Sequence, residues 1–281
     1  MKDTESINAL AKIFKKKKWF NIDDDDHIFD TFCDLLNILE PEERALIIEL
    51  TSNYYWITGD DYLKDIKEVI KSVPQTTFEG IKDILLFPIV KPTDDKKTKS
   101  GHGLTYDIKA MMPMSSNLRH VFPKIIEEFS EFGSGPASKA NQLLLLVDDF
   151  IGSGDTLDQC LKEIEGRTKI YYERTLIICI SCQLETYNLL TSKGINIYAK
   201  YLIERGITDF NVGSTIDEKK DLMRTIEKSI PGSNSLSLGF MESEALITLK
   251  RTPDNTFPVF WMRTRREGKY YNPPFLREKQ S

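Results

Sequence analysis

The sequence has no long hydrophobic run, no secretory signal and no large excess of one charge, and each absence excludes a class of protein. None of its apolar runs approaches the ~20 residues that a membrane-spanning helix needs. The N-terminal segment MKDTESINALAKIFKKKK is too polar for a secretory signal. A formal net charge of −5 on 281 residues gives no general attraction to nucleic acid or to anionic membranes. We therefore expect a cytoplasmic protein that is not associated with a membrane.

The chain also has few cysteines, which fits the same compartment. Cys33 and Cys160 fall on apolar helical faces. Cys179 and Cys182 form a Cys-x-x-Cys pair, a spacing that is used in zinc and redox sites. The pair lies within the strand-like run LIICISCQL, with no second pair and no histidine nearby. We therefore expect reduced cysteines in or beside a strand.

The first part of the chain has helical patterns. The lysine run at residues 15–18 and the aspartate run at residues 23–26 are short and indicate a solvated face or a loop. Apolar residues at helical spacing then predict three helices within residues 28–73. We expect an N-terminal helical segment over residues 1–76, which either docks a partner, drives oligomerisation or packs as part of the main domain.

Between residues 84 and 200, predicted strands and helices alternate. Strands are expected at residues 84–90, 104–112, 143–147, 175–182 and 195–202, and helices at 118–129, 157–164 and 184–194. Because the strands are mostly apolar throughout, they predict an α/β fold with a mainly parallel sheet flanked by helices. A helix at 216–230 and strands at 245–249 and 258–261 complete this domain, which we place at residues 77–262, before a basic tail at 263–281.

The stretch LLLLVDDFIGSGDTL, at residues 143–157, ends a buried strand in two adjacent acids. In open parallel sheets, ligands bind beyond the carboxyl ends of the strands, which is where Asp148 and Asp149 fall. Two neighbouring carboxylates repel each other, so they need hydroxyl donors, a cation or both. The vicinal hydroxyls of a ribose meet that need, because each can donate a hydrogen bond to a carboxylate.

The turn after the acids suits a phosphate. Gly152 and Gly154 can take backbone angles that are closed to other residues, so that successive N–H groups point into one concavity. Ser153 and Thr156 add hydroxyl donors, and the positive end of the next helix faces the same place. Carboxylates for a sugar followed by a turn for its phosphate predict a ribose-5-phosphate site.

Other phosphate-binding motifs fit this stretch less well. A P-loop needs Gly-Lys-Ser/Thr, and no lysine follows Gly154. A dinucleotide-binding fingerprint needs a third glycine where Leu157 stands, and its acidic residue comes after the turn rather than before it. A receiver domain has its acidic pair after the first strand and lacks this glycine turn.

The sequence V-D-D-F-I-G-S-G-D-T at residues 147–156 closely resembles the phosphoribosyl pyrophosphate (PRPP) motif of type I phosphoribosyltransferases. That motif is a hydrophobic strand, an acidic pair, a short variable stretch and a small-residue turn that ends Gly-x-Thr. K-S-G at residues 99–101, G-F-M-E-S-E-A-L at 239–246 and T-P-D-N-T-F-P-V-F-W at 252–261 look like the pattern of phosphoribosyltransferase-like proteins from bacterial conflict and phage-defence loci. The resemblance spans residues 28–262 and implies a Rossmann-like α/β fold.

The resemblance also implies roles for individual residues. Asp148 and Asp149 would be the catalytic acids, which hold the ribose hydroxyls directly or through Mg²⁺ and water. The 5′-phosphate would be cradled by the turn of Gly152, Ser153, Gly154, Asp155 and Thr156.

The pyrophosphate of such substrates is held by a loop after the first sheet strand. Here that loop is KPTDDKKTKSGHG at residues 91–103, in which Lys91 and Lys99 are the candidates and a solvated loop is the alternative. Asp155 departs from the family pattern, which often has a small or neutral residue there. An aspartate that faced the phosphate would repel it. We therefore expect Asp155 to face outward in the first turn of the helix, where its negative charge interacts favourably with the helix dipole and stabilises the helix.

The resemblance implies two functions between which the sequence does not decide. The first is a pentosyltransferase reaction on PRPP or a related nucleotide with Mg²⁺, as a toxin or effector in antiviral defence. The second is a non-catalytic sensor that reports occupancy of the same site to a protein or nucleic-acid partner. In phosphoribosyl transfer the acceptor itself attacks the ribose, so the protein needs no nucleophile.

Other residues are weaker candidates. His102 and His120 are available for acid–base chemistry. A core or surface-packing role is the favoured interpretation for the aromatic side chains that an acceptor site would use, which are Trp261, Phe257, Phe240, Tyr270 and Tyr271. The C-terminal stretch combines such aromatics with Arg263, Arg265, Arg266 and Lys269, as single-strand nucleic-acid binders do, but we favour a solvated tail there.

Overall fold

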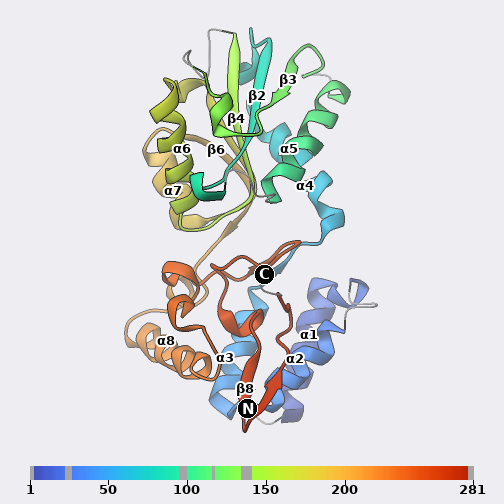
Figure 1. Cartoon of the computed structure of the whole chain (residues 1–281). Coiled ribbons are helices and arrows are strands. Elements are labelled where there is room, and N and C mark those ends of the chain that lie inside the picture. The colour runs from blue at the N-terminus through green and yellow to red at the C-terminus, as the bar shows by residue number, and fades with distance from the viewer. Residues whose placement is uncertain (1–2, 23–26, 95–99, 116–117, 134–140, 278–281) are drawn as a thin grey trace. The chain divides into compact units, whose positions relative to one another are not determined.

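The structure, a computed structural model, describes residues 3–22, 27–94, 100–115, 118–133 and 141–277. The chain divides into two compact units: Thr58–Ile203, and Met1–Ile57 together with Glu204–Ser281 (Figure 1). The sequence places boundaries at residues 76 and 262 instead. The difference arises because the third predicted helix packs on the sheet and the residues after the last sheet strand belong with the N-terminal helices. None of the helices in the described ranges has the length and apolar character that a bilayer crossing requires.

A five-stranded sheet forms the centre of the unit Thr58–Ile203. Its strands lie in the order β3 (Phe122–Ile125), β2 (Asp83–Pro88), β4 (Gln142–Ile151), β5 (Thr175–Gln183) and β6 (Asn196–Ile203). All neighbouring strands are parallel. Every residue of β5 is buried, which explains its unbroken apolar run. The predicted α/β fold with a mainly parallel sheet is therefore confirmed.

Helices cover both faces of this sheet (Figure 1). Helices α4 (Tyr62–Ser72) and α5 (Ser100–Met111) lie on one side, and α6 (Asp155–Arg167) and α7 (Leu184–Ser192) lie on the other. Because the strands are parallel, the loops that follow β2, β4 and β5 all leave the sheet at the carboxyl ends of the strands. Open α/β sheets bind ligands at these ends.

Two predictions within this unit are wrong. Residues 104–112 are not a strand, because most of them belong to α5, in which the buried Leu104 and Ile108 are four residues apart and share one helical face. Residues 118–129 are not a helix, because they contain β3. Pro123 is tolerated there because β3 is an edge strand, where not every N–H group is needed for pairing.

The other unit is built from both ends of the chain. Its helices are α1 (Asp3–Lys17), α2 (Ile28–Asn37), α3 (Pro41–Ser52) and α8 (Ser214–Glu227). Its strand pairs are β1 (Tyr55–Trp56) with β7 (Ile247–Thr248), which are parallel, and β8 (Thr264–Arg266) with β9 (Lys269–Tyr271), which are antiparallel. The core is aromatic: the rings of Tyr54 and Phe275 stack with centroids 5.2 Å apart. The sequence did not predict α1, although its fully buried Leu10 and Phe14 have helical spacing.

Two predictions near the C-terminus are also wrong. Residues 258–261 are not a strand, because Pro258–Phe260 form a 3₁₀ helix with buried side chains. Residues 263–281 are not a solvated tail over the part that is described. Arg266 there bonds the carboxylate of Glu43 at 3.0 Å, and the only strands after residue 262 in the described ranges pair as the β8–β9 hairpin.

Candidate functional site

The acidic pair lies near the carboxyl end of β4, within the strand itself. Asp148 is half-buried and Asp149 is 8% exposed. The backbone N–H of Asp149 donates to Oδ1 of Asp148 at 2.9 Å. The hydroxyl of Tyr62, the first residue of α4, donates to Oδ2 of Asp149 at 2.9 Å. The two carboxylates are therefore held in place by the strand and by α4.

The glycine turn connects β4 to α6. Gly154 precedes α6 with a φ of 82°, and a Cβ atom there would lie 3.2 Å from Cγ2 of Thr186. The hydroxyl of that threonine, in the first turn of α7, donates to the carbonyl of Gly152 at 2.6 Å. The positive φ and the close approach of α7 both favour glycine at position 154.

The start of α6 presents backbone donors at this turn. The N–H of Asp158 donates to the carbonyl of Gly154 at 2.9 Å, which begins the helical ladder. The N–H groups before it have no earlier carbonyl of the helix to bond, so they suit an anion. Ser153 and Thr156 are half-buried beside them, and the Oγ of Ser153 is 3.5 Å from the backbone nitrogen of Asp155.

Lys91, which follows β2 in the chain, reaches the same turn. Its Nζ lies 2.6 Å from Oδ2 of Asp155, and about a third of each side chain is exposed. Hydrogen bonds from Lys91 and then from Gln159 lower the pKa of Asp155. We expected Asp155 to face outward, whereas its carboxylate faces Lys91. Of the two pyrophosphate candidates, Lys91 is therefore at the turn, and Lys99 lies outside the described residues.

A second polar cluster involves α4, one turn after Tyr62. Lys200 of β6 pairs with Asp65 at 2.5 Å and with Glu68 at 2.8 Å. Burial lowers the pKa of Lys200, but its hydrogen bonds to Asp65 and Glu68 raise it above the ordinary value. Asp65 is 1% exposed, and its Oδ2 has no hydrogen-bond partner among the described residues.

The sequence patterns did not reveal Tyr62 or this cluster. Tyr62 and Asp149 are 87 residues apart, and Lys200 and Asp65 are 135 residues apart, so no local pattern joins them. One signal was available. Asp65 falls on the otherwise apolar stripe of α4, beside the buried Ile66, and a buried acid in such a stripe indicates a polar partner.

Two adjacent carboxylates, at Asp148 and Asp149, have the donor chemistry that Mg²⁺ takes when the phosphates of a ligand complete its coordination. Across the described ranges, no three histidine, cysteine, aspartate or glutamate side chains are grouped to hold a metal ion. Mg²⁺ usually keeps several waters and takes one or two carboxylates plus substrate phosphates, so Asp148 and Asp149 can supply the protein's share. Binding of Mg²⁺ by Asp148 and Asp149 would therefore require the phosphates of a ligand.

The cysteines and histidines form no competing site within the described residues. Cys179 and Cys182 are free and fully buried in β5, as the sequence predicts, and burial raises the pKa of Cys179. His102 lies in α5, where its carbonyl accepts a hydrogen bond from the hydroxyl of Thr105 at 2.7 Å. His120 is exposed just before β3.

Two of the stretches that carry the family resemblance, 239–246 and 252–261, are hydrogen-bonded to each other in the unit that holds both chain ends. The N–H of Phe240 donates to the carbonyl of Asp254 at 2.9 Å. Glu244 is fully buried, where it accepts hydrogen bonds from the N–H groups of Ile207 and Thr208, both at 2.8 Å. These contacts give the two stretches a structural role.

Comparison with protein families agrees with the motif. The family model PRTase-CE matches residues 40–277. Among solved structures, the chain is similar to the Helicobacter pylori Xanthine-Guanine-Hypoxanthine Phosphoribosyltransferase, with 19% sequence identity and a TM-score of 0.29. That match covers 53% of this chain and 84% of the other. A comparison with curated proteins gives no match.

Proposed function

Because the chain belongs to the PRTase-CE family, we propose that it binds PRPP, or a related ribose-5-phosphate nucleotide, at the carboxyl end of β4. The observation that carries the proposal is the sequence of groups along one short segment. Two carboxylates lie near the end of the strand, Gly154 turns the chain in the left-handed conformation, and α6 begins at once. This order supports the proposal, because groups that would accept hydrogen bonds from sugar hydroxyls lie next to groups that would donate to a phosphate.

In this proposal Asp148 and Asp149 accept hydrogen bonds from the ribose hydroxyls. An ionised carboxylate has about four acceptor positions, so the hydrogen bond from Tyr62 leaves Asp149 with further capacity. The backbone donors at the start of α6, with the hydroxyls of Ser153 and Thr156, hold the 5′-phosphate.

Lys91 is the residue we propose for the pyrophosphate. Its ion pair with Asp155 is about one-third exposed, and such pairs contribute only ~0–1 kcal/mol. A pyrophosphate carries more negative charge than one carboxylate and would replace Asp155 as the partner of Lys91. Mg²⁺, when bound with the substrate, would neutralise part of the charge on the pyrophosphate.

The reaction that this arrangement supports is phosphoribosyl transfer to an acceptor. As the bond from the anomeric carbon to pyrophosphate breaks, positive charge develops on the ribose ring and negative charge on the leaving group. The carboxylates and the phosphate turn would fix the ribose at both ends, and such positioning can lower a barrier by up to ~7–11 kcal/mol. Lys91 would stabilise the leaving group.

Titration of PRPP with Mg²⁺ by calorimetry tests the binding site. We expect Asp148→Asn to weaken binding about 10- to 100-fold, because a hydrogen bond to a charged acceptor contributes ~1.5–3 kcal/mol. Asp221→Asn, which removes an exposed acid on α8, is the matched control and should bind as the parent does. Equal affinity in the parent and Asp148→Asn, with both folded, would refute the assignment.

Release of pyrophosphate across a panel of bases and nucleotides then separates the two functional classes. Turnover supports a pentosyltransferase, and a toxin or effector role in antiviral defence would rest on that activity. PRPP binding without turnover under every condition supports a sensor that acts through a protein or nucleic-acid partner.

A further inference from the structure

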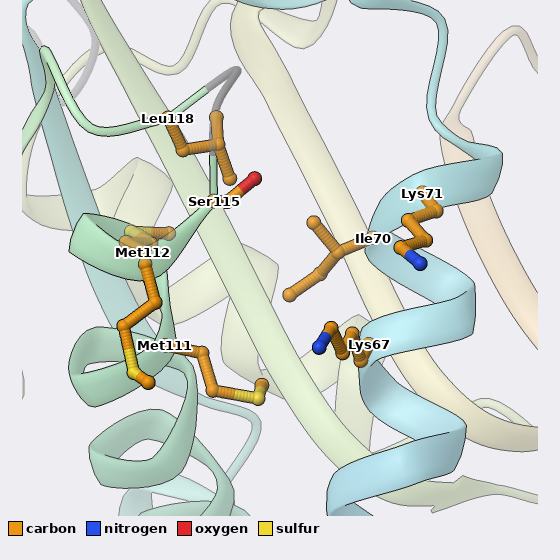
Figure 2. A pocket seen from close by; sticks show the side chains of 8 residues that line it. Lys67, Ile70, Lys71, Met111, Met112, Ser115 and Leu118 are labelled. Atoms are coloured by element: carbon orange, nitrogen blue, oxygen red, sulfur yellow. The ribbon is translucent and has the colours of Figure 1, made fainter.

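A cavity of about 240 Å³ lies in the unit Thr58–Ile203, between α4 and the segment that ends α5 (Figure 2). None of its lining residues belongs to the proposed ribose-phosphate site. Lys67, Ile70 and Lys71 form the α4 side, and Met111, Met112 and Leu118 form much of the opposite side. Figure 2 shows Lys67 and Ile70 pointing from α4 toward that opposite wall.

The walls of the cavity combine an adaptable apolar surface with positive charge. Met112 and Leu118 are each 2% exposed and close its inner side. Methionine side chains are flexible and polarisable, so they adjust to ligands of different shape. Lys67 and Lys71 are exposed, and neither forms an ion pair with the residues that the structure describes. Like charges four residues apart on a helix repel each other, and a bound anion would relieve that repulsion.

The size of the cavity favours a single inserted side chain over a complete small molecule. Pockets for drug-sized ligands measure roughly 300–1,000 Å³, and this cavity, of about 240 Å³, is smaller. Apolar surface continues outside it: Met114, which also lines the cavity, is 81% exposed. Leu63, one turn before Lys67 on the same stripe of α4, is 51% exposed. A cavity with apolar surroundings and a basic rim is the complement of an acidic peptide with an apolar anchor.

We propose that this cavity is the docking site for an acidic segment of a partner protein, which inserts one apolar side chain between α4 and α5 and places its carboxylates against Lys67 and Lys71. The proposal uses only the residues that line the cavity and the charges of Lys67 and Lys71. It is therefore independent of PRPP binding.

Selection of a random peptide library displayed on phage, against the whole chain, tests the proposal. We expect enriched peptides in which Asp or Glu flanks Phe, Leu, Met or Trp. Synthetic copies of these peptides are then titrated by fluorescence polarisation against the parent chain and variants. The double variant Lys67→Glu with Lys71→Glu should weaken binding at least about tenfold, because it replaces attraction at the rim by repulsion.

A matched double variant separates local charge from net charge. Lys169→Glu with Lys193→Glu changes the net charge equally, at exposed lysines after α6 and α7 that do not line the cavity, and should bind the peptides as the parent does. Met111→Asp, which puts a negative charge on the apolar wall, should also abolish binding. Thermal unfolding shows whether each variant keeps the parent's fold, and PRPP titration shows whether the proposed ribose site is intact.

Several results would overturn the proposal. One is the absence of any enriched peptide, and another is equal binding of the selected peptides to the parent and to Lys67→Glu with Lys71→Glu. If octanoate, an apolar chain with one carboxylate, binds in the cavity while acidic peptides do not, the ligand is a small molecule. If the parent self-associates in sedimentation and the double variant does not, the occupant is a second copy of the chain.

Discussion

Raising the pH from about 4.5 to about 8 should weaken the unit that holds both chain ends, because Glu227 must lose a proton there. Glu227 lies at the end of α8 and is 2% exposed. Burial raises its pKa from 4.5 to about 7, although hydrogen bonds from the hydroxyl of Ser237 and the N–H of Leu238 oppose the rise. Its Oε1 has no hydrogen-bond partner within the described part of the chain.

The size of the effect follows from the rise in pKa. Each unit corresponds to about 1.4 kcal/mol, so a rise from 4.5 to about 7 corresponds to about 3 kcal/mol. The folded chain holds the proton more tightly than the unfolded chain. The contribution is therefore fully present below pH 4.5 and is lost as the pH rises through about 7.

Urea unfolding of the parent and of Glu227→Gln across this range measures the effect. The amide stays neutral and can still accept the two hydrogen bonds, so the variant should gain about 3 kcal/mol relative to the parent as the pH rises. Glu218→Gln, an exposed position on the same helix, is the control and should follow the parent. A difference between parent and Glu227→Gln that does not change with pH would refute the reasoning.

Two further predictions use matched pairs of variants, each measured by urea unfolding. Tyr62→Phe removes a donor from a buried carboxylate and should lower the free energy of unfolding by ~1.5–3 kcal/mol, whereas Tyr106→Phe, at a side chain 68% exposed, should have little effect; equal effects would contradict the hydrogen bond. Gly101→Ala would put a Cβ 2.9 Å from the carbonyl oxygen of Val147 and should destabilise by ~1–3 kcal/mol, whereas Gly103→Ala, in open space on the same helix, should stabilise by up to ~1 kcal/mol. The same sign for both glycine variants would show that α5 does not pack as closely as described.

The central strands β4 and β5 could be predicted from the sequence because they are buried along nearly their whole length. A strand such as β5 has no solvent face, so it is apolar throughout, and parallel sheets covered by helices favour that pattern. The acidic pair and the glycine turn could be located for a similar reason, since the turn is a local feature whose backbone angles call for Gly154.

The parts that could not be predicted depend on contacts between distant residues or on short ambiguous runs. Residues 104–112 are apolar enough for a strand, and the close approach of Gly101 to β4 depends on a helix packing there. Neither the hydrogen bond from Tyr62 to Asp149 nor the ion pair between Lys91 and Asp155 leaves a local pattern. A single sequence therefore indicates the motif but not the side chains that orient it.

The division of one unit between the two ends of the chain has a consequence for biosynthesis. The hydroxyls of Tyr54 and Thr248 lie 2.7 Å apart in the finished protein but are separated by 194 residues. While the ribosome is still translating, Phe32 and Tyr54 emerge without Phe260 and Phe275, their later neighbours. The continuous segment Thr58–Ile203 can complete its own contacts in the meantime. The nascent chain thus carries an incomplete aromatic core, with its apolar surface exposed, until Phe260 and Phe275 arrive.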